Sequence, residues 1–382
     1  MRYLTAGDSH GPGLVVIVDG VPAGVPLEPA HIERDLARRR AGYGRSGRMS
    51  QETEKVQIWG GLYRGVTTGA PLGIIIPNRV GPRVAGPEVY RIPRPGHADL
   101  AGFLKYSPPD LFPVQERASA RETSARCAAG AVARRLLEEV GVRVFSLVTS
   151  IGAVTAPGVG ANELAEDLPA GGPDLTAGGQ VGWDDLAARA EASPVRCPWE
   201  GASSAMQEEI ARAARAGDTL GGTFVVVATG VPPGLGTYAQ RDRRLDGRLA
   251  AAVMSVPAIK GVEIGLGFAG ASLPGSRAHD SILPGFVRPT NRAGGLEGGV
   301  TTGQPLLLRA AMKPIPTLPG GLPSVDLVTG EATRAPAQRA DVCAVPAAAV
   351  VAEAAVAWEL ARALLERYGG DRLQDIKAGM GR

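Results

Sequence analysis

The sequence predicts an α+β fold in which helices pack on antiparallel sheets and the chain consists of two halves of similar topology. The stretch "GGLYRGVTTGAPL" at 60–72 returns as "GGLEGGVTTGQPL" at 294–306. The stretch "GDSHGPGLVVIVDGVPAG" at 7–24 returns as "GDTLGGTFVVVATGVPPG" at 217–234. Two segments that recur in the same order indicate an internal duplication about a pseudo-two-fold axis. The glycine-centred turns favour hairpins, and no regular βαβ alternation is found.

Each half is predicted to contain the same elements in the same order. A valine-rich strand ends at a Gly-Val-Pro turn, and a helix and a second strand follow it. A Gly-Thr-Thr-Gly turn then leads into an apolar strand, and an alanine-rich helix comes last. The expected ranges are strands at 14–19 and 223–229, helices at 29–40 and 243–255, strands at 55–59 and 260–265, strands at 71–77 and 305–311, and helices at 121–140 and 346–367.

We expect a single domain over 1–382, with repeat halves at about 1–145 and 215–382. The excursion 146–214 joins them, and its Gly- and Pro-rich part at 154–183 is expected on the surface.

Composition excludes several classes of protein. The chain has 382 residues, of which 44% are hydrophobic, so it can bury a large core. It has no apolar run of roughly 20 residues and no signal-like N-terminus, so we expect a cytoplasmic protein with no membrane partner. The net charge of +3 argues against nucleic acid, and three distant cysteines without a CxxC pair predict no metal site.

Two histidines occupy turns that have no backbone need for imidazole. In "AGDSHGPG", His10 sits among glycine and proline, and the repeat places Leu220 opposite it. The turn is therefore made twice but carries a histidine only once, which favours a chemical role for His10. His97 in "RIPRPGHADL" follows Pro-Gly in the same way, with Arg94 nearby.

Other motifs narrow the chemistry. "GLGFAG" at 265–270 matches a dinucleotide motif, but proline stands where the phosphate-binding helix would begin, so we reject it. Arginine clusters lie at 38–48 and 117–126, and guanidinium groups bind phosphates and carboxylates. The residues indicate a proton-handling site for a multiply anionic small molecule. An ordinary flavin oxidoreductase and an arginine-rich RNA-binding module are the alternatives, and the low aromatic content disfavours the second.

Nine ordered motifs resemble the chorismate synthase family from end to end. They are "GDSHG" (7–11), "RRRAGYGRSGRMSQE" (38–52), "RPGHAD" (94–99), "RASARETSARCAAGA" (117–131), "GDTLGG" (217–222), "KGVEIGLGF" (260–268), "NRAGGLEGGVTTGQP" (291–305), "KPIPT" (313–317) and "RADVCAVPA" (339–347). The resemblance implies a lyase that eliminates phosphate from 5-enolpyruvylshikimate 3-phosphate to give chorismate, with reduced FMN as cofactor. It also implies a homotetramer whose subunits have two antiparallel sheets sandwiching helices.

The resemblance further implies roles for particular residues. His10 would protonate the flavin, His97 would protonate or hydrogen-bond the leaving phosphate, and Asp341 would accept a proton from the flavin. The anionic groups of the substrate would be bound by Arg39, Arg45, Arg48, Arg121 and Arg339. In some family members, a pyridine nucleotide is assigned instead to the counterparts of Arg39 and Arg45. The expected FMN contacts are Arg117, Ala118, Ser119, Pro257, Ala258, Gly298, Lys313, Pro314, Ile315, Pro316, Thr317 and Arg339.

Three positions depart from the family's pattern. Asp8 stands where glutamate is common, Ala118 where serine is common, and Pro257 where asparagine or glutamine is usual. The last of these, Pro257, puts in doubt only one flavin contact, made through a side chain. NADPH is a candidate reductant of the flavin, and the sequence leaves open whether the chain reduces its own cofactor.

Overall fold

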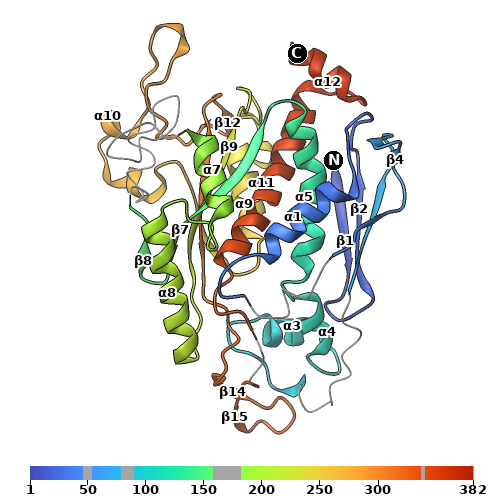
Figure 1. Ribbon diagram of the computed structural model, residues 1–382, viewed down its shortest axis with the longest axis vertical. Helices are drawn as coiled ribbons and strands as arrows, with labels where there is room; N and C mark the ends of the chain where they lie inside the picture. The colour runs from blue at the N-terminus through green and yellow to red at the C-terminus, as the bar shows by residue number, and fades with distance from the viewer. Residues whose placement is uncertain (46–53, 79–89, 158–181, 337–339, 382) are drawn as a thin grey trace.

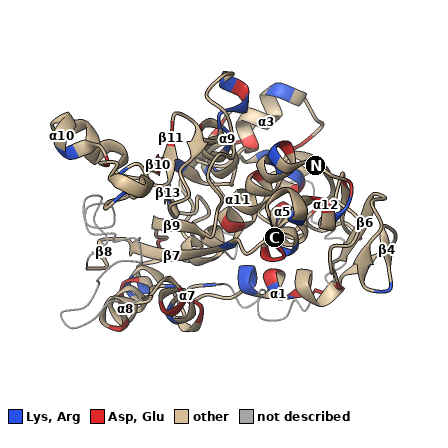
Figure 2. Ribbon diagram, turned by 90° about the horizontal axis from the view of Figure 1, so that it is seen from above, with Lys and Arg blue, Asp and Glu red and all other residues tan. Residues whose placement is uncertain are grey.

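Two antiparallel sheets enclose a layer of helices. The computed structural model describes residues 1–45, 54–78, 90–157, 182–336 and 340–381. One sheet has four strands in the order β1-β2-β6-β3, and the other has five in the order β10-β13-β9-β7-β8. Seen from above, α5 and α11 lie between them (Figure 2). The predicted α+β class with antiparallel sheets is confirmed.

The four-stranded sheet alternates in burial along its strands. Its members are β1 (Arg2–Gly7), β2 (Gly13–Asp19), β6 (Leu72–Pro77) and β3 (Gln57–Ile58). On β2, Leu14, Val16 and Val18 are buried, whereas Val15 and Ile17 are exposed. Because successive side chains of a strand point to opposite faces, one face of this sheet packs on the helices and the other faces outward.

The five-stranded sheet is buried more completely. Its members are β10 (Ile259–Ile264), β13 (Leu306–Met312), β9 (Gly222–Thr229), β7 (Arg143–Ile151) and β8 (Val154–Thr155). Helices α7 (Trp183–Ala192) and α8 (Glu200–Ala216) contact β7, and so does α11. Most of β7 is therefore buried on both faces, and part of the expected excursion 146–214 belongs to this sheet.

The central layer consists of α5 (Glu122–Glu138) and α11 (Val345–Tyr368), close to the predicted ranges 121–140 and 346–367. Helix α5 packs on β1 and β2, and α11 packs on β7 and β9. The two helices approach closely where Gly130 faces Ala354: a Cβ built on Gly130 would lie 2.3 Å from the Cβ of Ala354. Helices α1 (Pro29–Arg40) and α9 (Leu245–Met254) flank this pair.

Shorter elements gather at the two ends of the molecule. The lower end in Figure 1 carries α3 (Asp99–Tyr106), α4 (Phe112–Arg117), β14 (Pro323–Val325) and β15 (Ala332–Arg334). The upper end carries α12 (Leu373–Gly379) and the hairpin of β11 (Leu296–Glu297) and β12 (Val300–Thr301). A second hairpin joins β4 (Leu62–Tyr63) to β5 (Val66–Thr67).

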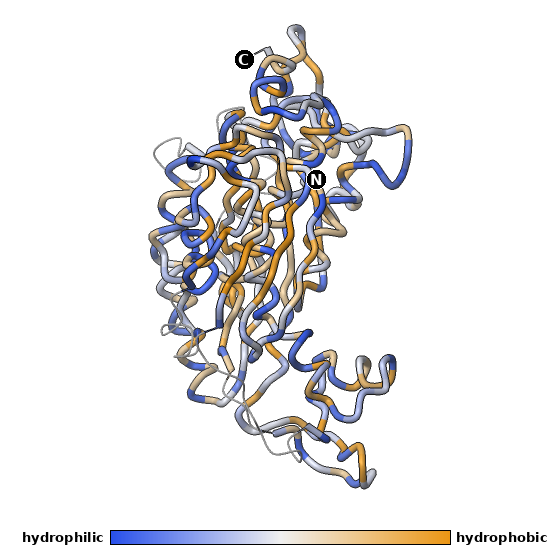
Figure 3. The backbone as a smooth tube through the Cα atoms, turned by 90° about the vertical axis from the view of Figure 1, so that its right-hand side faces the viewer, coloured by the Kyte–Doolittle hydropathy of each residue, from blue (hydrophilic) through white to orange (hydrophobic). Residues whose placement is uncertain are grey.

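Apolar segments concentrate in the strands and helices of the middle (Figure 3). A continuous cluster of buried side chains runs through both sheets and the helices between them. Among the residues described, no helix is long and apolar enough to cross a membrane.

Candidate active site

Several loops meet at the end of the sandwich that carries α3 and α4. The turn 8–12 joins β1 to β2, and Asn78 follows β6 at the same edge, since Gly13 pairs with Pro77. In the other sheet, Met312 pairs with Gly222 and Ile259, so the loop 313–317 and Ala258 also lie at one edge. The predicted site residues His10, Ala258 and 313–317 belong to these loops.

His10 is fixed by a buried carboxylate and a braced turn. Its Nδ1 lies 2.6 Å from Oε1 of Glu116, and its backbone N–H donates to Oε2 of the same carboxylate, also at 2.6 Å. The amide of Asn78 donates to the carbonyl oxygens of Asp8, Ser9 and Gly11. Hydrogen bonds therefore hold both the backbone of the turn and the imidazole of His10.

His97 is held in a similar way by Asp99. The two side chains approach to 2.5 Å between Nδ1 and Oδ1, and Asp99 is fully buried. Arg94 donates to Asp99 from its backbone N–H and its guanidinium group. Burial alone would raise the pKa of Asp99, but hydrogen bonds from His97 and Arg94 hold that pKa well below its usual range. Asp99 is therefore an anion at neutral pH.

Helix α4 connects the two histidines. Gln115 donates to Oδ2 of Asp99 at 3.1 Å, while the adjacent Glu116 binds His10. Just beyond the helix, the hydroxyl of Ser119 donates to that of Ser9 at 3.0 Å. The two histidine loops therefore depend on neighbouring residues of one short segment.

Arginines gather beside these loops. The side chain of Arg39 is buried, with Nε bound to the Thr123 hydroxyl and Nη2 to the carbonyl of Ala120. Burial lowers the pKa of Arg39, and the positive charges of Arg45 and Arg121 lower it further against the opposing effects of Cys127 and Glu54.

Each of the other two arginines has a carboxylate partner. Nη1 of Arg45 lies 2.6 Å from Oδ2 of Asp341, and both side chains are largely buried. Arg121 pairs with the buried Glu54 and also donates from Nε to Asn78 at 3.0 Å. Asp341 and Arg45, predicted from motifs almost 300 residues apart, are thus brought together.

The loop 313–317 completes the group of contacts. The Lys313 ammonium donates to the carbonyl of Gly96, next to His97, and its backbone N–H donates to the carbonyl of Ala258 at 3.0 Å. Ala258 has a positive φ of 70°, so its carbonyl is presented by a backbone conformation that L-residues rarely adopt. The carbonyl of Ile315 accepts from the hydroxyl of Thr219 at 2.7 Å.

Among the other predicted residues, Arg117 lies beside the His10 turn, whereas Gly298 lies far from it. Arg48 and Arg339 are outside the described residues. Arg117 ends α4 with a partly exposed side chain, and it donates to the carbonyl and hydroxyl oxygens of Thr5. Gly298 lies in the β11–β12 hairpin, which precedes β13, and Lys313 directly follows β13. The seven residues of this strand therefore separate the hairpin from Lys313. At about 3.3 Å per residue, this strand spans roughly 20 Å.

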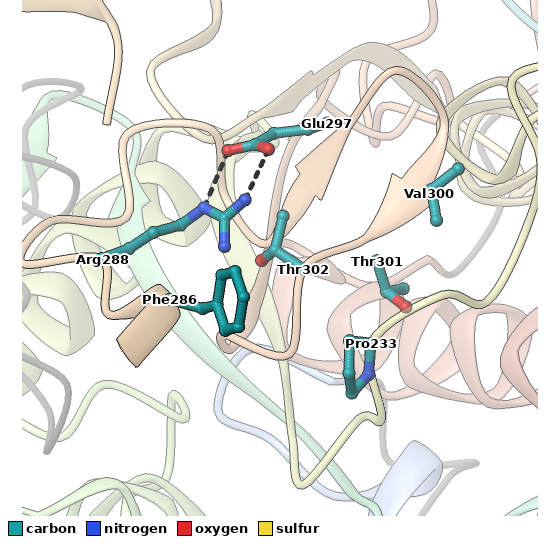
Figure 4. A pocket seen from close by; sticks show the side chains of 7 residues that line it. All are labelled: Pro233, Phe286, Arg288, Glu297, Val300, Thr301 and Thr302. Atoms are coloured by element: carbon teal, nitrogen blue, oxygen red, sulfur yellow. Dashed lines mark hydrogen bonds and ion pairs between the residues drawn. The ribbon is translucent and has the colours of Figure 1, made fainter. Parts of the chain in front are cut away.

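A hollow of about 550 Å³ opens beside that hairpin (Figure 4). Arg288 and Glu297 face each other in it through two hydrogen bonds of 3.0 and 2.8 Å. Phe286 lines the same hollow and is highly exposed. None of the predicted catalytic residues lines it, so the histidine loops remain the candidate active site.

Sequence reasoning did not single out Glu116, Asn78 or Glu54 as parts of the site. Glu116 is 106 residues from His10, and no local pattern signals that pairing. Asp99 had a signal, because it lies two residues after His97 in the same turn.

The fold and the groups gathered at this end, guanidinium cations and carboxylate-bound imidazoles, are those of a class of enzymes that act on multiply anionic small molecules. Guanidinium groups supply sites for phosphate and carboxylate, and imidazoles oriented by carboxylates are suited to acid–base work.

Comparisons with known proteins identify that enzyme class more closely. The family model described as chorismate synthase matches residues 1–365. A chorismate synthase of Moorella thermoacetica is 54% identical over 391 residues, covering 99% of this chain and 96% of the relative. One of Desulforudis audaxviator is 51% identical, covering 98% and 95%. A crystal structure of chorismate synthase superposes with a TM-score of 0.79 at 39% identity, covering 100% of this chain and 96% of the other.

The chain belongs to the chorismate synthase family. It is a carbon–oxygen lyase that eliminates phosphate from 5-enolpyruvylshikimate 3-phosphate to give chorismate, the last step of the shikimate pathway.

Proposed function

We propose that the elimination takes place where the loops of His10, His97 and Lys313 meet, with reduced FMN as cofactor. The observation that carries this proposal is the unbroken series of contacts among these loops. Helix α4 binds His10 and reaches Asp99, which holds His97, and Lys313 binds Gly96. A solvated charged face would not require such ties between distant segments.

The donors at this end fit anionic groups. Nη1 of Arg39 and Nε of Arg45 are buried and have no hydrogen-bond partner among the residues that the structure describes. A buried guanidinium N–H without a partner costs free energy, which a phosphate or carboxylate oxygen would recover. Arg39, Arg45 and Arg121 would hold the substrate's anionic groups, with Arg48 and Arg339 proposed from the resemblance alone.

The flavin contacts are proposed for the loops around this cluster. They comprise Arg117 at the end of α4, Ala118 and Ser119 after it, Pro257 and Ala258 before β10, and the loop 313–317. Reduced FMN, when bound, would supply the electron density that lets phosphate leave in a 1,4-elimination whose departing proton is unactivated. NADPH remains the proposed external reductant of that flavin.

The chain's own residues would then manage protons and charge. His97 would donate a hydrogen bond or a proton to the departing phosphate, because Asp99 orients its ring. Asp341 would accept a proton, with Arg45 holding its carboxylate in place at 2.6 Å. His10 would hold a proton next to the cofactor.

We propose an oligomer, consistent with the expected homotetramer. Leu4 and Ile17 pair across β1 and β2 on the outward face of the four-stranded sheet, 76% and 49% exposed respectively. Val15 lies on the same face, and contiguous exposed apolar residues favour coverage by a partner. Gly298 would reach a flavin only from another subunit, because β13 separates it from the loops of its own chain.

We also propose that the chain is one domain that arose by duplication. The order β2, α1, β3, β4–β5, β6, α5 is matched by β9, α9, β10, β11–β12, β13, α11. In both series the first and fifth of these elements are antiparallel partners, β2 with β6 and β9 with β13. The matched order and pairing support the proposal.

The test is phosphate release from 5-enolpyruvylshikimate 3-phosphate under anaerobic conditions. Three reactions are compared: dithionite-reduced FMN, oxidised FMN with NADPH, and no flavin. Phosphate release only with dithionite-reduced FMN would support reduced FMN as the cofactor. It would also indicate that the electrons that reduce the flavin come from outside this chain. Release with NADPH as well would add an intrinsic flavin reductase, and release without any flavin would refute the cofactor proposal.

A further inference from the structure

The carboxylate of Glu116 contacts a single residue, His10, through both of its oxygens. Oε2 accepts the backbone N–H of His10 and Oε1 contacts its Nδ1, both at 2.6 Å. The Glu116 side chain is only 7% exposed. Among the described parts of the chain, no hydrogen bond to this carboxylate comes from any other residue. Glu116 is thus dedicated to His10, whereas Asp99 divides its bonds among His97, Arg94 and Gln115.

This geometry fixes the position of a proton. Where the Glu116 carboxylate is ionised, it has no hydrogen to donate, so Nδ1 of His10 carries the hydrogen of this contact. The neutral ring is then the Nδ1–H tautomer, in which Nε2 carries the lone pair that can accept a proton. The backbone bond to the same carboxylate fixes the ring's position relative to the turn as well as its tautomer.

His31 provides the opposite case within the same chain. Its Nδ1 accepts the backbone N–H of Glu28 at 3.0 Å, at the start of α1. The neutral ring of His31 must therefore be the Nε2–H tautomer. Two histidines of one protein are thus expected to differ in tautomer for reasons visible in their contacts.

We propose that Glu116 is a positioning residue that holds His10 as the Nδ1–H tautomer and directs Nε2 to the reaction. The inference rests on the proposed role of His10 in proton handling. Glu116 acts through the imidazole and does not itself touch the reacting atoms.

Substitution of Glu116→Gln tests the proposal because it preserves shape and removes one acceptor. Glutamine has one oxygen and one NH₂ group, so it cannot accept from both N–H groups of His10. With the NH₂ group toward Nδ1, the ring must accept there and carry its proton on Nε2 instead. The matched control is Glu122→Gln, because Glu122 lies nearby on α5 but binds Thr5 and Arg126 rather than a histidine.

The first measurement is nitrogen-15 NMR of histidine-labelled protein, whose chain has four histidines. His10→Ala and His31→Ala assign the signals by their loss. Wild type should show His10 as Nδ1–H and His31 as Nε2–H above their titration range. Glu116→Gln should move the His10 nitrogens toward the His31 pattern, and Glu122→Gln should leave them in place.

The second measurement is phosphate release in steady state. Glu116→Gln should lower kcat roughly 10- to 100-fold with KM for the phosphate substrate within about threefold, since the arginine cluster is untouched. Unchanged His10 nitrogen shifts in Glu116→Gln, or Nε2–H at His10 in wild type, would overturn positioning by Glu116. Wild-type turnover in His10→Ala would instead remove the proposed role of His10 itself.

Discussion

Replacing Glu353 by glutamine should destabilise the protein more than any surface change on the same helix. Glu353 lies on α11, is fully buried, and binds three arginines. Arg38 donates to both its oxygens at 2.8 and 3.0 Å, Arg134 at 2.8 Å and Arg196 at 3.0 Å. Glu353→Gln removes the negative charge that these buried guanidinium groups share. It also places an NH₂ group, which is a hydrogen-bond donor, against guanidinium donors. Breaking a buried ion pair from one side costs about 3–5 kcal/mol, and we expect a loss near 3 because one oxygen remains.

The pH dependence follows from the direction of the Glu353 pKa. Burial alone would raise that pKa, but Arg38, Arg196 and Arg134 lower it well below its usual range. A carboxylate with a lowered pKa contributes stability above the pKa of the unfolded chain, about 4.3, and loses it as the pH falls toward the folded value. The difference between wild type and Glu353→Gln should therefore be constant from about pH 6 to about pH 8 and shrink below about pH 4.3.

Urea unfolding followed by tryptophan fluorescence measures this difference. The control is Glu366→Gln, also on α11, because Glu366 pairs with Arg248 at a partly exposed site and should change stability by less than about 1 kcal/mol. A loss below about 1 kcal/mol in Glu353→Gln at pH 7 would refute the reasoning. A difference that grows on acidification would refute the sign of the pKa argument.

Three further outcomes are expected. His97→Ala should lower turnover roughly 10- to 1,000-fold in the phosphate-release assay with the fold intact, and wild-type turnover would contradict its role. Asp341→Asn should reduce phosphate release more than FMN binding measured by flavin fluorescence, because the amide cannot accept the proton; equal losses would mark Asp341 as structural. Gly130→Ala should cost about 1–3 kcal/mol in urea unfolding, since its Cβ would meet Ala354, whereas Gly201→Ala on α8 has open space and should be neutral or stabilising.

The sequence predicted the elements whose pattern is local. The valine-rich strand expected at 14–19 is β2, Gly13–Asp19, and the helix expected at 29–40 is α1, Pro29–Arg40. The alternation of apolar and polar residues in a strand and the periodic pattern of a helix involve residues close in sequence. Both can therefore be recognised from the sequence alone. The strand β7 was placed in an excursion because only repeated segments were assigned to the halves, although its apolar run is typical of a strand buried on both faces.

The site was predictable only in part. The histidines stood out because turns do not require imidazole, and the arginines because they cluster. The pairing of His10 with Glu116 could not be predicted from residues alone, since it joins positions 106 apart and depends on how α4 is folded against the turn. Gly298 was placed by resemblance, and a single chain leaves it at the other end of the sandwich.

If Arg39, Arg45 and Arg121 bind the substrate's anionic groups as proposed, they link the lifetime of the enzyme to the supply of its substrate. Burial disfavours the charged form of Arg39, so the ligand-free fold carries a desolvation cost at this guanidinium group. A polyanion that binds only the folded chain offsets that cost and stabilises the chain by mass action, by about 2.7 kcal/mol at one hundred times its Kd. Unfolded molecules, which proteases remove, then become about a hundredfold rarer. Substrate that accumulates would thus protect the enzyme that consumes it, without any separate regulatory site.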